Sequence, residues 1–107
     1  MSDIFNKIKS LIENKSVVIS SHGYDELAED GIFIKDIMKS VKQGKVVEEY
    51  PDYFKGPCVL VMQKDSRGNA IHVVWGIPKG KDSPAVLVTS YKPDPSKWTD
   101  DFMERRK

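Results

Sequence analysis

The chain has 107 residues, of which 39% are hydrophobic and 31% are charged, and its formal net charge is +1. A chain of this length forms one domain with a single core, and its composition is typical of a folded protein, which excludes a disordered segment. No apolar stretch approaches the roughly 20 residues of a membrane-spanning helix. The N-terminus lacks a basic region followed by an apolar run, so we expect no export signal and a cytoplasmic protein.

The single cysteine and the uneven charge set further limits. Cys58 alone excludes an internal disulfide and a multi-cysteine metal site. Residues 1–31 hold three Lys and six Asp or Glu, whereas residues 32–107 hold fourteen Lys or Arg and ten Asp or Glu. The basic second part is compatible with RNA binding, although dedicated nucleic-acid binders usually carry a larger excess. Ordinary solvated charges are the alternative interpretation.

The first part of the chain has the periodicity of helices. Apolar residues recur at helical spacing in residues 3–14, which predicts an amphipathic helix. Ser21 is a good N-cap for a helix over residues 22–30, and Gly31 fits its left-handed C-terminal cap. A third helix has its apolar stripe at Ile34, Ile37, Met38 and Val41.

From residue 45 onward the apolar pattern has the period of two that is typical of strands. The predicted strands cover residues 45–50, 58–64, 69–77 and 84–91, with a candidate edge strand at 16–20. Short polar connections between the later strands favour antiparallel neighbours. The predicted fold is therefore α+β, with N-terminal helices packed on one face of a four-stranded antiparallel sheet. Residues 99–106 are compatible with a short C-terminal helix.

The alternation also predicts which side chains share a face of the sheet. If residue 64 pairs with residue 69, and residue 77 with residue 84, His72 lies opposite Thr89, with Tyr91 one diagonal step away. These three side chains form a candidate site that does not by itself name a substrate. The apolar face, which we expect under the helices, contains Cys58, Leu60, Met62, Ile71, Val73, Trp75, Ile77, Val86 and Val88. A slip of one residue would invert the faces.

Several short motifs follow one another in a recognisable order. They are His22, Gly31-Ile32, Asp36, Gly44, Tyr50-Pro51, His72-Val73-Val74, Thr89-Ser90-Tyr91-Lys92-Pro93-Asp94 and Trp98. This order resembles a small bacterial and archaeal family of unknown function that is regarded as distantly related to the RelE, ParE and BrnT toxins of type II toxin–antitoxin systems. The resemblance covers about residues 17–106 of a single domain of residues 1–107, and it leaves residues 3–14 as an additional helix.

The resemblance implies a RelE-like fold and a metal-independent RNA endonuclease that needs no cofactor. Its expected partners are RNA or the ribosome and a cognate antitoxin. In such cleavage a 2′-hydroxyl attacks the adjacent phosphorus and expels the 5′-oxygen, which requires a base, an acid and cations. We expect His72 to be the base or acid, Tyr91 to donate a proton or position the phosphate, and His22 to be a second proton-transfer group. The expected substrate-binding residues are Lys92, Arg67 and Thr89.

A catalytically inert protein-binding module of the same fold is the alternative function. His72 can be a hydrogen-bonded structural histidine, His22 can brace its helix, and Tyr91 can anchor the end of the sheet through its hydroxyl. A metal held by the two histidines and Asp94 would lack tight ligand spacing. The acidic residues that follow His22 would repel RNA if they faced the site; they are Glu26, Glu29 and Asp30.

Overall fold

The computed structural model describes residues 2–107, which form an α+β fold. The helices are α1 (Asp3–Glu13), α2 (Ser21–Asp30) and α3 (Ile34–Ser40), and the 3-10 turn η1 (Val41–Gln43) follows α3. The strands are β1 (Val17–Ile19), β2 (Lys45–Tyr50), β3 (Cys58–Lys64), β4 (Ala70–Gly76) and β5 (Ala85–Tyr91). The predicted class and the antiparallel meander of β2 to β5 are confirmed.

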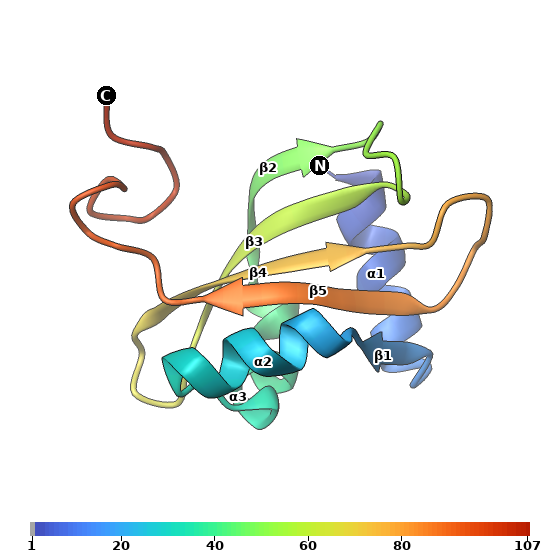
Figure 1. Cartoon of the computed structure of the whole chain (residues 1–107), viewed down its shortest axis with the longest axis horizontal. Helices are drawn as coiled ribbons and strands as arrows, with labels where there is room; N and C mark the ends of the chain where they lie inside the picture. The colour runs from blue at the N-terminus through green and yellow to red at the C-terminus, as the bar shows by residue number, and fades with distance from the viewer. Residues whose placement is uncertain (1) are drawn as a thin grey trace.

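The sheet has five strands in the order β1-β5-β4-β3-β2 and is mixed, not purely antiparallel (Figure 1). The prediction of four antiparallel strands is incomplete because β1 adds a parallel strand beside β5. Backbone hydrogen bonds fix this edge at both ends of β1. The Ala85 N–H donates to the Ser16 carbonyl at 2.9 Å, and the Ser20 N–H donates to the Leu87 carbonyl at 3.0 Å.

The β3–β4 hairpin differs from the prediction by one residue. Lys64 pairs with Ala70, so residues 65–69 form the loop. The Asp65 carboxylate closes this loop by accepting the N–H groups of Arg67 and Asn69, both at 2.9 Å. Since loop length sets the register of a hairpin, the longer loop turns β3 over relative to the prediction.

The two faces of the sheet are therefore assigned differently from the prediction. The face covered by helices carries Val59, Val61, Gln63, Ile71, Val73, Trp75 and Leu87. The prediction for β4 is confirmed, whereas the predicted face is wrong for five residues of β3 and β5, namely Cys58, Leu60, Met62, Val86 and Val88. A bulge at Val88 shifts the register of β5, because Val74 pairs with Thr89 and Trp75 with Leu87. The hairpin before the bulge is already one residue off the predicted register, since Gly76 pairs with Val86 and not with Ala85. The two shifts together place His72 opposite Tyr91, not Thr89.

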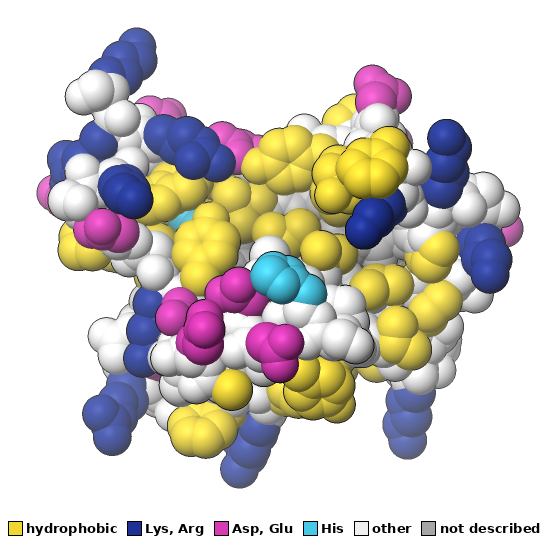
Figure 2. All heavy atoms as spheres, viewed as in Figure 1, with side chains coloured by type: hydrophobic (Ala, Val, Ile, Leu, Met, Phe, Trp, Pro, Cys, Tyr) yellow, Lys and Arg dark blue, Asp and Glu magenta, His cyan; other side chains and the backbone are white. Residues whose placement is uncertain are grey.

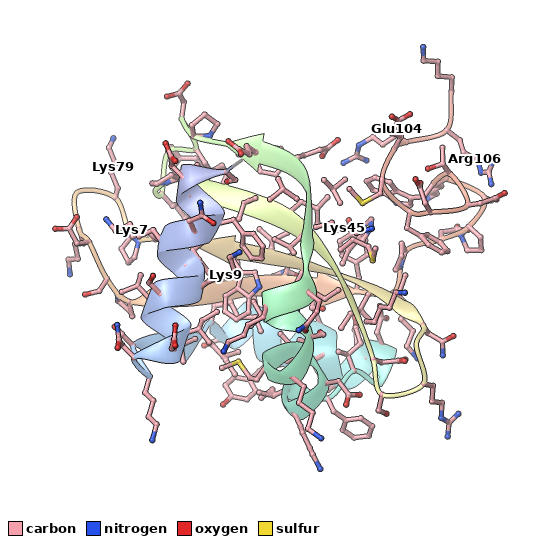
Figure 3. The ribbon with its side chains drawn as sticks, turned by 180° about the vertical axis from the view of Figure 1, so that it is seen from behind. Lys7, Lys9, Lys45, Lys79, Glu104 and Arg106 are labelled. Atoms are coloured by element: carbon pink, nitrogen blue, oxygen red, sulfur yellow. The ribbon has the colours of Figure 1, made fainter. Side chains whose placement is uncertain are left out.

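The helices cover the sheet from two directions. α1 lies on the far side in Figure 1 and in front of the sheet in Figure 3, where it buries Phe5 and Ile8 in the core. α2 runs alongside β5 at the edge of the sheet (Figure 1), and its Leu27 packs in the same core as Phe5 and Ile8 of α1. The N-cap of α2 is Ser20, one residue before the predicted Ser21, and Gly31 ends it in the left-handed conformation as predicted.

A buried polar side chain joins the sheet to α3. The Gln63 amide donates to the Ile37 carbonyl at 2.8 Å and to the Ser40 hydroxyl at 3.0 Å. Its carbonyl oxygen accepts the Trp75 indole N–H at 2.9 Å. Both ends of this amide are thus satisfied inside the core, which is the condition for burying it without a large penalty.

The C-terminal tail, residues 92–107, folds back beside the open face of the sheet (Figure 1). No helix forms over residues 99–106; instead Trp98 and Arg105 form an isolated bridge. The Asp101 carboxylate accepts the Met103 N–H, and the Thr99 hydroxyl accepts the Glu104 N–H. These side chains thus take backbone donors that a helix would use. None of the helices within residues 2–107 has the length and apolar character to cross a bilayer.

Candidate functional site

His72 lies at one end of the open face, enclosed by aromatic side chains. It is fully buried, and its ring meets the Trp98 ring edge-on with 4.5 Å between centroids. The Tyr91 ring lies 5.3 Å away, also edge-on. Trp98 belongs to the C-terminal tail, so the tail covers the residue that the sequence places at the centre of the candidate site.

The hydrogen bonds of His72 define its tautomer. Nε2 lies 2.8 Å from the Phe102 carbonyl oxygen, which can only accept, so Nε2 carries the proton. In the neutral ring Nδ1 is then an acceptor, and it receives the Tyr91 hydroxyl at 3.1 Å. Burial lowers the pKa of His72 and raises the pKa of Tyr91, which keeps both groups neutral near pH 7.

An ion pair fastens the tail beside this cluster. The Arg105 guanidinium donates two hydrogen bonds to the Glu48 carboxylate, each 3.1 Å long, and stacks 4.7 Å from the centre of the Trp98 ring. The Tyr50 hydroxyl also donates to Glu48. Hydrogen bonding to Arg105 lowers the pKa of Glu48, while burial raises the pKa of Tyr50 to about 12. The tail is thus fixed to β2 as well as to β4.

His22 is not part of the His72 cluster. It lies on the surface of α2, with Nε2 3.4 Å from a Glu26 carboxylate oxygen. It lines a hollow near Gly76, at the opposite end of β4 from His72. Four residues of a strand span about 13 Å, so two proton-transfer groups on one phosphate cannot be His22 and His72 in this arrangement. Thr89 lies opposite Val74, one pair further along the sheet.

The structure does bring Arg67 and Lys92 together. Both line a polar hollow of about 320 Å³ next to Phe33, whose side chain is strongly exposed. An adjoining hollow of about 510 Å³ contains three further cations, Lys39, Lys45 and Lys64. The two hollows share Asp36, Asp65 and Ser66, and we call them together the polar trough.

The sequence prediction missed three of these cations and the aromatic residue. Lys45 begins β2 and points toward the side where the tail lies (Figure 3). Lys45 pairs with Met62 across β2 and β3, and Met62 pairs with His72 across β3 and β4. Lys45 therefore lies in the same cross-strand row as His72, which the predicted hairpin register did not reveal. Within residues 2–107 no three His, Cys, Asp or Glu side chains gather as metal ligands would.

No curated protein and no solved structure matches the chain. A family model described as a domain of unknown function, DUF4258, matches residues 19–92. The matched range contains both histidines, Tyr91 and all five cations of the polar trough, and it ends before Trp98 of the tail. The chain belongs to the DUF4258 family.

Proposed function

We propose that this protein binds single-stranded RNA along the polar trough. The observation that carries the proposal is the gathering of five exposed cations around one end of the sheet. They are Lys39, Lys45, Lys64, Arg67 and Lys92. Among residues 2–107 none of them forms a salt bridge, so their charges are free to neutralise phosphates.

The acidic groups of the trough oppose this charge only in part. Asp36 and Asp65 are the two carboxylates in its lining. The Asp65 carboxylate already accepts two backbone N–H groups of its own turn, and these hydrogen bonds lower its pKa. A phosphate chain passing through the trough would therefore meet more cations than anions.

The aromatic side chain at the trough favours an unpaired strand. Phe33 is 69% exposed and lines the same hollow as Arg67 and Lys92. An exposed aromatic ring beside cations can stack on an unpaired base while the cations hold the backbone, which is the common arrangement in proteins that bind single strands. A base in a duplex is already stacked and does not offer its face.

Two further considerations support RNA as the ligand. The motif order resembles the relatives of RelE, ParE and BrnT, whose expected substrate is RNA, and a RelE-like fold is part of this proposal. Glu26 and Glu29 of α2 belong to an acidic surface beside His22, where Figure 2 shows Asp and Glu side chains, whereas the Asp30 carboxylate accepts the Lys92 backbone N–H at 2.9 Å and so lies next to the trough. RNA would be repelled beside His22, so the charge distribution directs it to the trough.

Cleavage of the bound RNA is the second candidate, and the row formed by Lys45, Met62, His72 and Tyr91 favours it. This row places a histidine and a tyrosine beside a residue of the trough. With the C-terminal tail in its observed position, the His72 Nε2–H donates to the Phe102 carbonyl, and the imidazole ring is buried. Cleavage would require the tail to move, since a proton-transfer group must reach the 2′-hydroxyl or the leaving 5′-oxygen.

Fluorescence anisotropy with a labelled single-stranded RNA oligonucleotide tests binding. We expect the triple variant Lys64→Gln/Arg67→Gln/Lys92→Gln to bind at least about tenfold more weakly at low salt, because three phosphate contacts are lost. The matched control is Lys79→Gln/Lys81→Gln/Lys97→Gln, which removes the same charge away from the trough; Lys79 lies far from Lys45 in Figure 3. Equal weakening by both triple variants, or no binding by the wild type, would refute the proposal.

A denaturing gel of the same RNA separates binding from cleavage. Discrete fragments produced by the wild type and lost in Tyr91→Phe would assign cleavage to the row of His72. Intact RNA with the wild type, under conditions where anisotropy shows binding, would reject cleavage and leave the binding function.

A further inference from the structure

The open face of the sheet has an apolar hollow at the end away from the polar trough. Its volume is about 380 Å³, and it lies between α2 and the β2–β3 connection. Its floor is one row across three strands, in which Cys58 pairs with Gly76 and Gly76 with Val86. In Figure 2 the hollow belongs to the depression at the centre of the view, where hydrophobic side chains (yellow) and backbone (white) are visible.

A glycine stands in the middle of this row, and its neighbours approach it closely. A Cβ atom at position 76 would lie 3.3 Å from the Cys58 Cβ and 3.4 Å from the Val88 Cγ2. Any larger side chain at Gly76 would project into the hollow. These distances are shorter than most Cβ contacts, so glycine lets Cys58 and Val88 approach the strand closely, and no side chain from position 76 fills the hollow.

Exposed aromatic residues stand beside the hollow. Tyr53 lines it and is 45% exposed, and its ring lies 4.9 Å from the ring of Phe54, which is 68% exposed. Large aromatic side chains that are exposed next to an apolar depression are characteristic of surfaces that bind other proteins.

Acidic side chains of α2 lie beside the hollow, although none of them is part of its lining. His22 lines the hollow from α2, and Glu26 and Glu29 follow it at helical spacing on the same side of the helix. Figure 2 shows a group of Asp and Glu side chains next to the exposed histidine, which is His22 because His72 is buried. The cation of the lining, Lys55, lies on the other wall, 5.7 Å from the Phe54 ring.

We infer that the apolar hollow binds a segment of a partner protein in which apolar side chains are flanked by Lys or Arg. The apolar side chains would enter the space above Gly76, and the basic side chains would face the carboxylates of α2. Charge complementarity selects this occupant, because an acidic segment or a nucleic acid would be repelled by α2. The site lies at the opposite end of the strands from the polar trough, so both can be occupied together.

Two synthetic peptides of equal length provide the test, one alternating Leu and Lys and the other alternating Leu and Glu. Each carries a fluorescent label, and anisotropy measures its affinity for the full-length protein. We expect the Leu-Lys peptide to bind at least about tenfold more tightly than the Leu-Glu peptide, corresponding to about 1.4 kcal/mol. In NMR spectra of the labelled protein, its addition should shift the amides of Gly76 and Val88.

Three variants distinguish the hollow from nonspecific attraction. Val88→Ser tests the apolar lining, and Glu26→Gln/Glu29→Gln tests the carboxylates of α2 beside the hollow; each should weaken binding of the Leu-Lys peptide severalfold. Glu13→Gln/Glu49→Gln removes the same charge from exposed positions away from the hollow and should leave the affinity unchanged. Equal affinity for both peptides, or an equal loss in the two charge variants, would overturn the inference. Circular dichroism verifies that each variant is folded.

Discussion

At the scale of single residues, His72 shows how the surroundings of a histidine determine what it can do. The Phe102 carbonyl accepts from Nε2, and the Tyr91 hydroxyl donates to Nδ1, so neither ring nitrogen is free. The same residue in an open site would be a candidate proton carrier. Here it links β4 to β5 and to the C-terminal tail, and a catalytic role depends on displacement of that tail.

His72 should make the stability of the protein depend on pH. Burial lowers its pKa in the folded state, whereas the unfolded chain takes up a proton below about pH 6.5. The stability that depends on neutral His72 is therefore present above that pH and is lost as pH falls through it toward the folded pKa. Urea unfolding of the wild type should show a falling free energy of unfolding between about pH 7.5 and 5.5.

The two histidines supply matched controls for this prediction. His22→Gln should retain the decline of the wild type, because His22 is exposed on α2. His72→Gln should lose most of it, although its stability at pH 7.5 is lower because hydrogen bonds to the tail are changed. A decline that persists in His72→Gln and disappears in His22→Gln would show that His72 is not the titrating group.

At the scale of elements, the contact between α3 and the sheet depends on Gln63. Replacing Gln63 by Leu would leave the Trp75 indole N–H and the Ile37 carbonyl without their partner in the core. We expect Gln63→Leu to lower the free energy of unfolding by about 1–3 kcal/mol, measured by urea unfolding. The control Gln43→Leu changes an exposed glutamine and should stay within about 0.5 kcal/mol. A Gln63→Leu variant as stable as the wild type would show that this network contributes nothing.

The C-terminal tail should depend on Arg105 for its attachment. The Arg105–Glu48 pair is partly exposed, so solvent screening limits its contribution to no more than about 1 kcal/mol. Arg105→Gln should nevertheless make Trp98 more accessible to acrylamide quenching, because the guanidinium also stacks on its ring. Trp75 is buried in the core and provides an unquenched background.

Arg106 offers the control for the tail. Its side chain pairs with Asp100 and donates to the Pro95 carbonyl, so its contacts stay within the tail. Arg106→Gln should therefore leave Trp98 quenching near the wild-type level. If both arginine variants expose Trp98 equally, the attachment of the tail does not depend on the Glu48 ion pair.

The elements also show where sequence patterns succeed and where they fail. Apolar periodicity predicted α1 and the strands β2 to β5 nearly to their bounds, because it reflects burial along a single element. It could not predict the loop at residues 65–69 or the bulge at Val88, since each depends on how two strands meet. Contacts distant in the chain, such as Phe102 with His72, left no periodic signal.

The candidate site was predicted in part for the same reason. His72 and Tyr91 are in contact as the alternation suggested, although through a different register. Arg67 and Lys92 line one hollow, whereas His22 lies at another end of the molecule. Lys39, Lys45 and Lys64 went unnoticed because they come from separate elements that only the folded sheet brings together.

At the scale of the whole molecule, charge is divided between two ends of the sheet. Cations surround the hairpin end, and Glu26 lies beside His22 at the edge of the apolar hollow, although the formal net charge is only +1. A small net charge can therefore conceal a surface that attracts phosphates in one region and basic side chains in another. We propose RNA as the ligand of the first region and a protein segment as the ligand of the second.

The most direct test of the RNA assignment is an NMR titration of isotope-labelled protein with single-stranded RNA, which reports where the ligand binds. We predict that the largest amide shifts occur in residues 64–69, at Phe33 and at Lys92, with little change in α1. Shifts confined to the basic C-terminal residues 105–107, or to α2 and the apolar hollow, would contradict the account. The absence of any shift at low salt would do so as well.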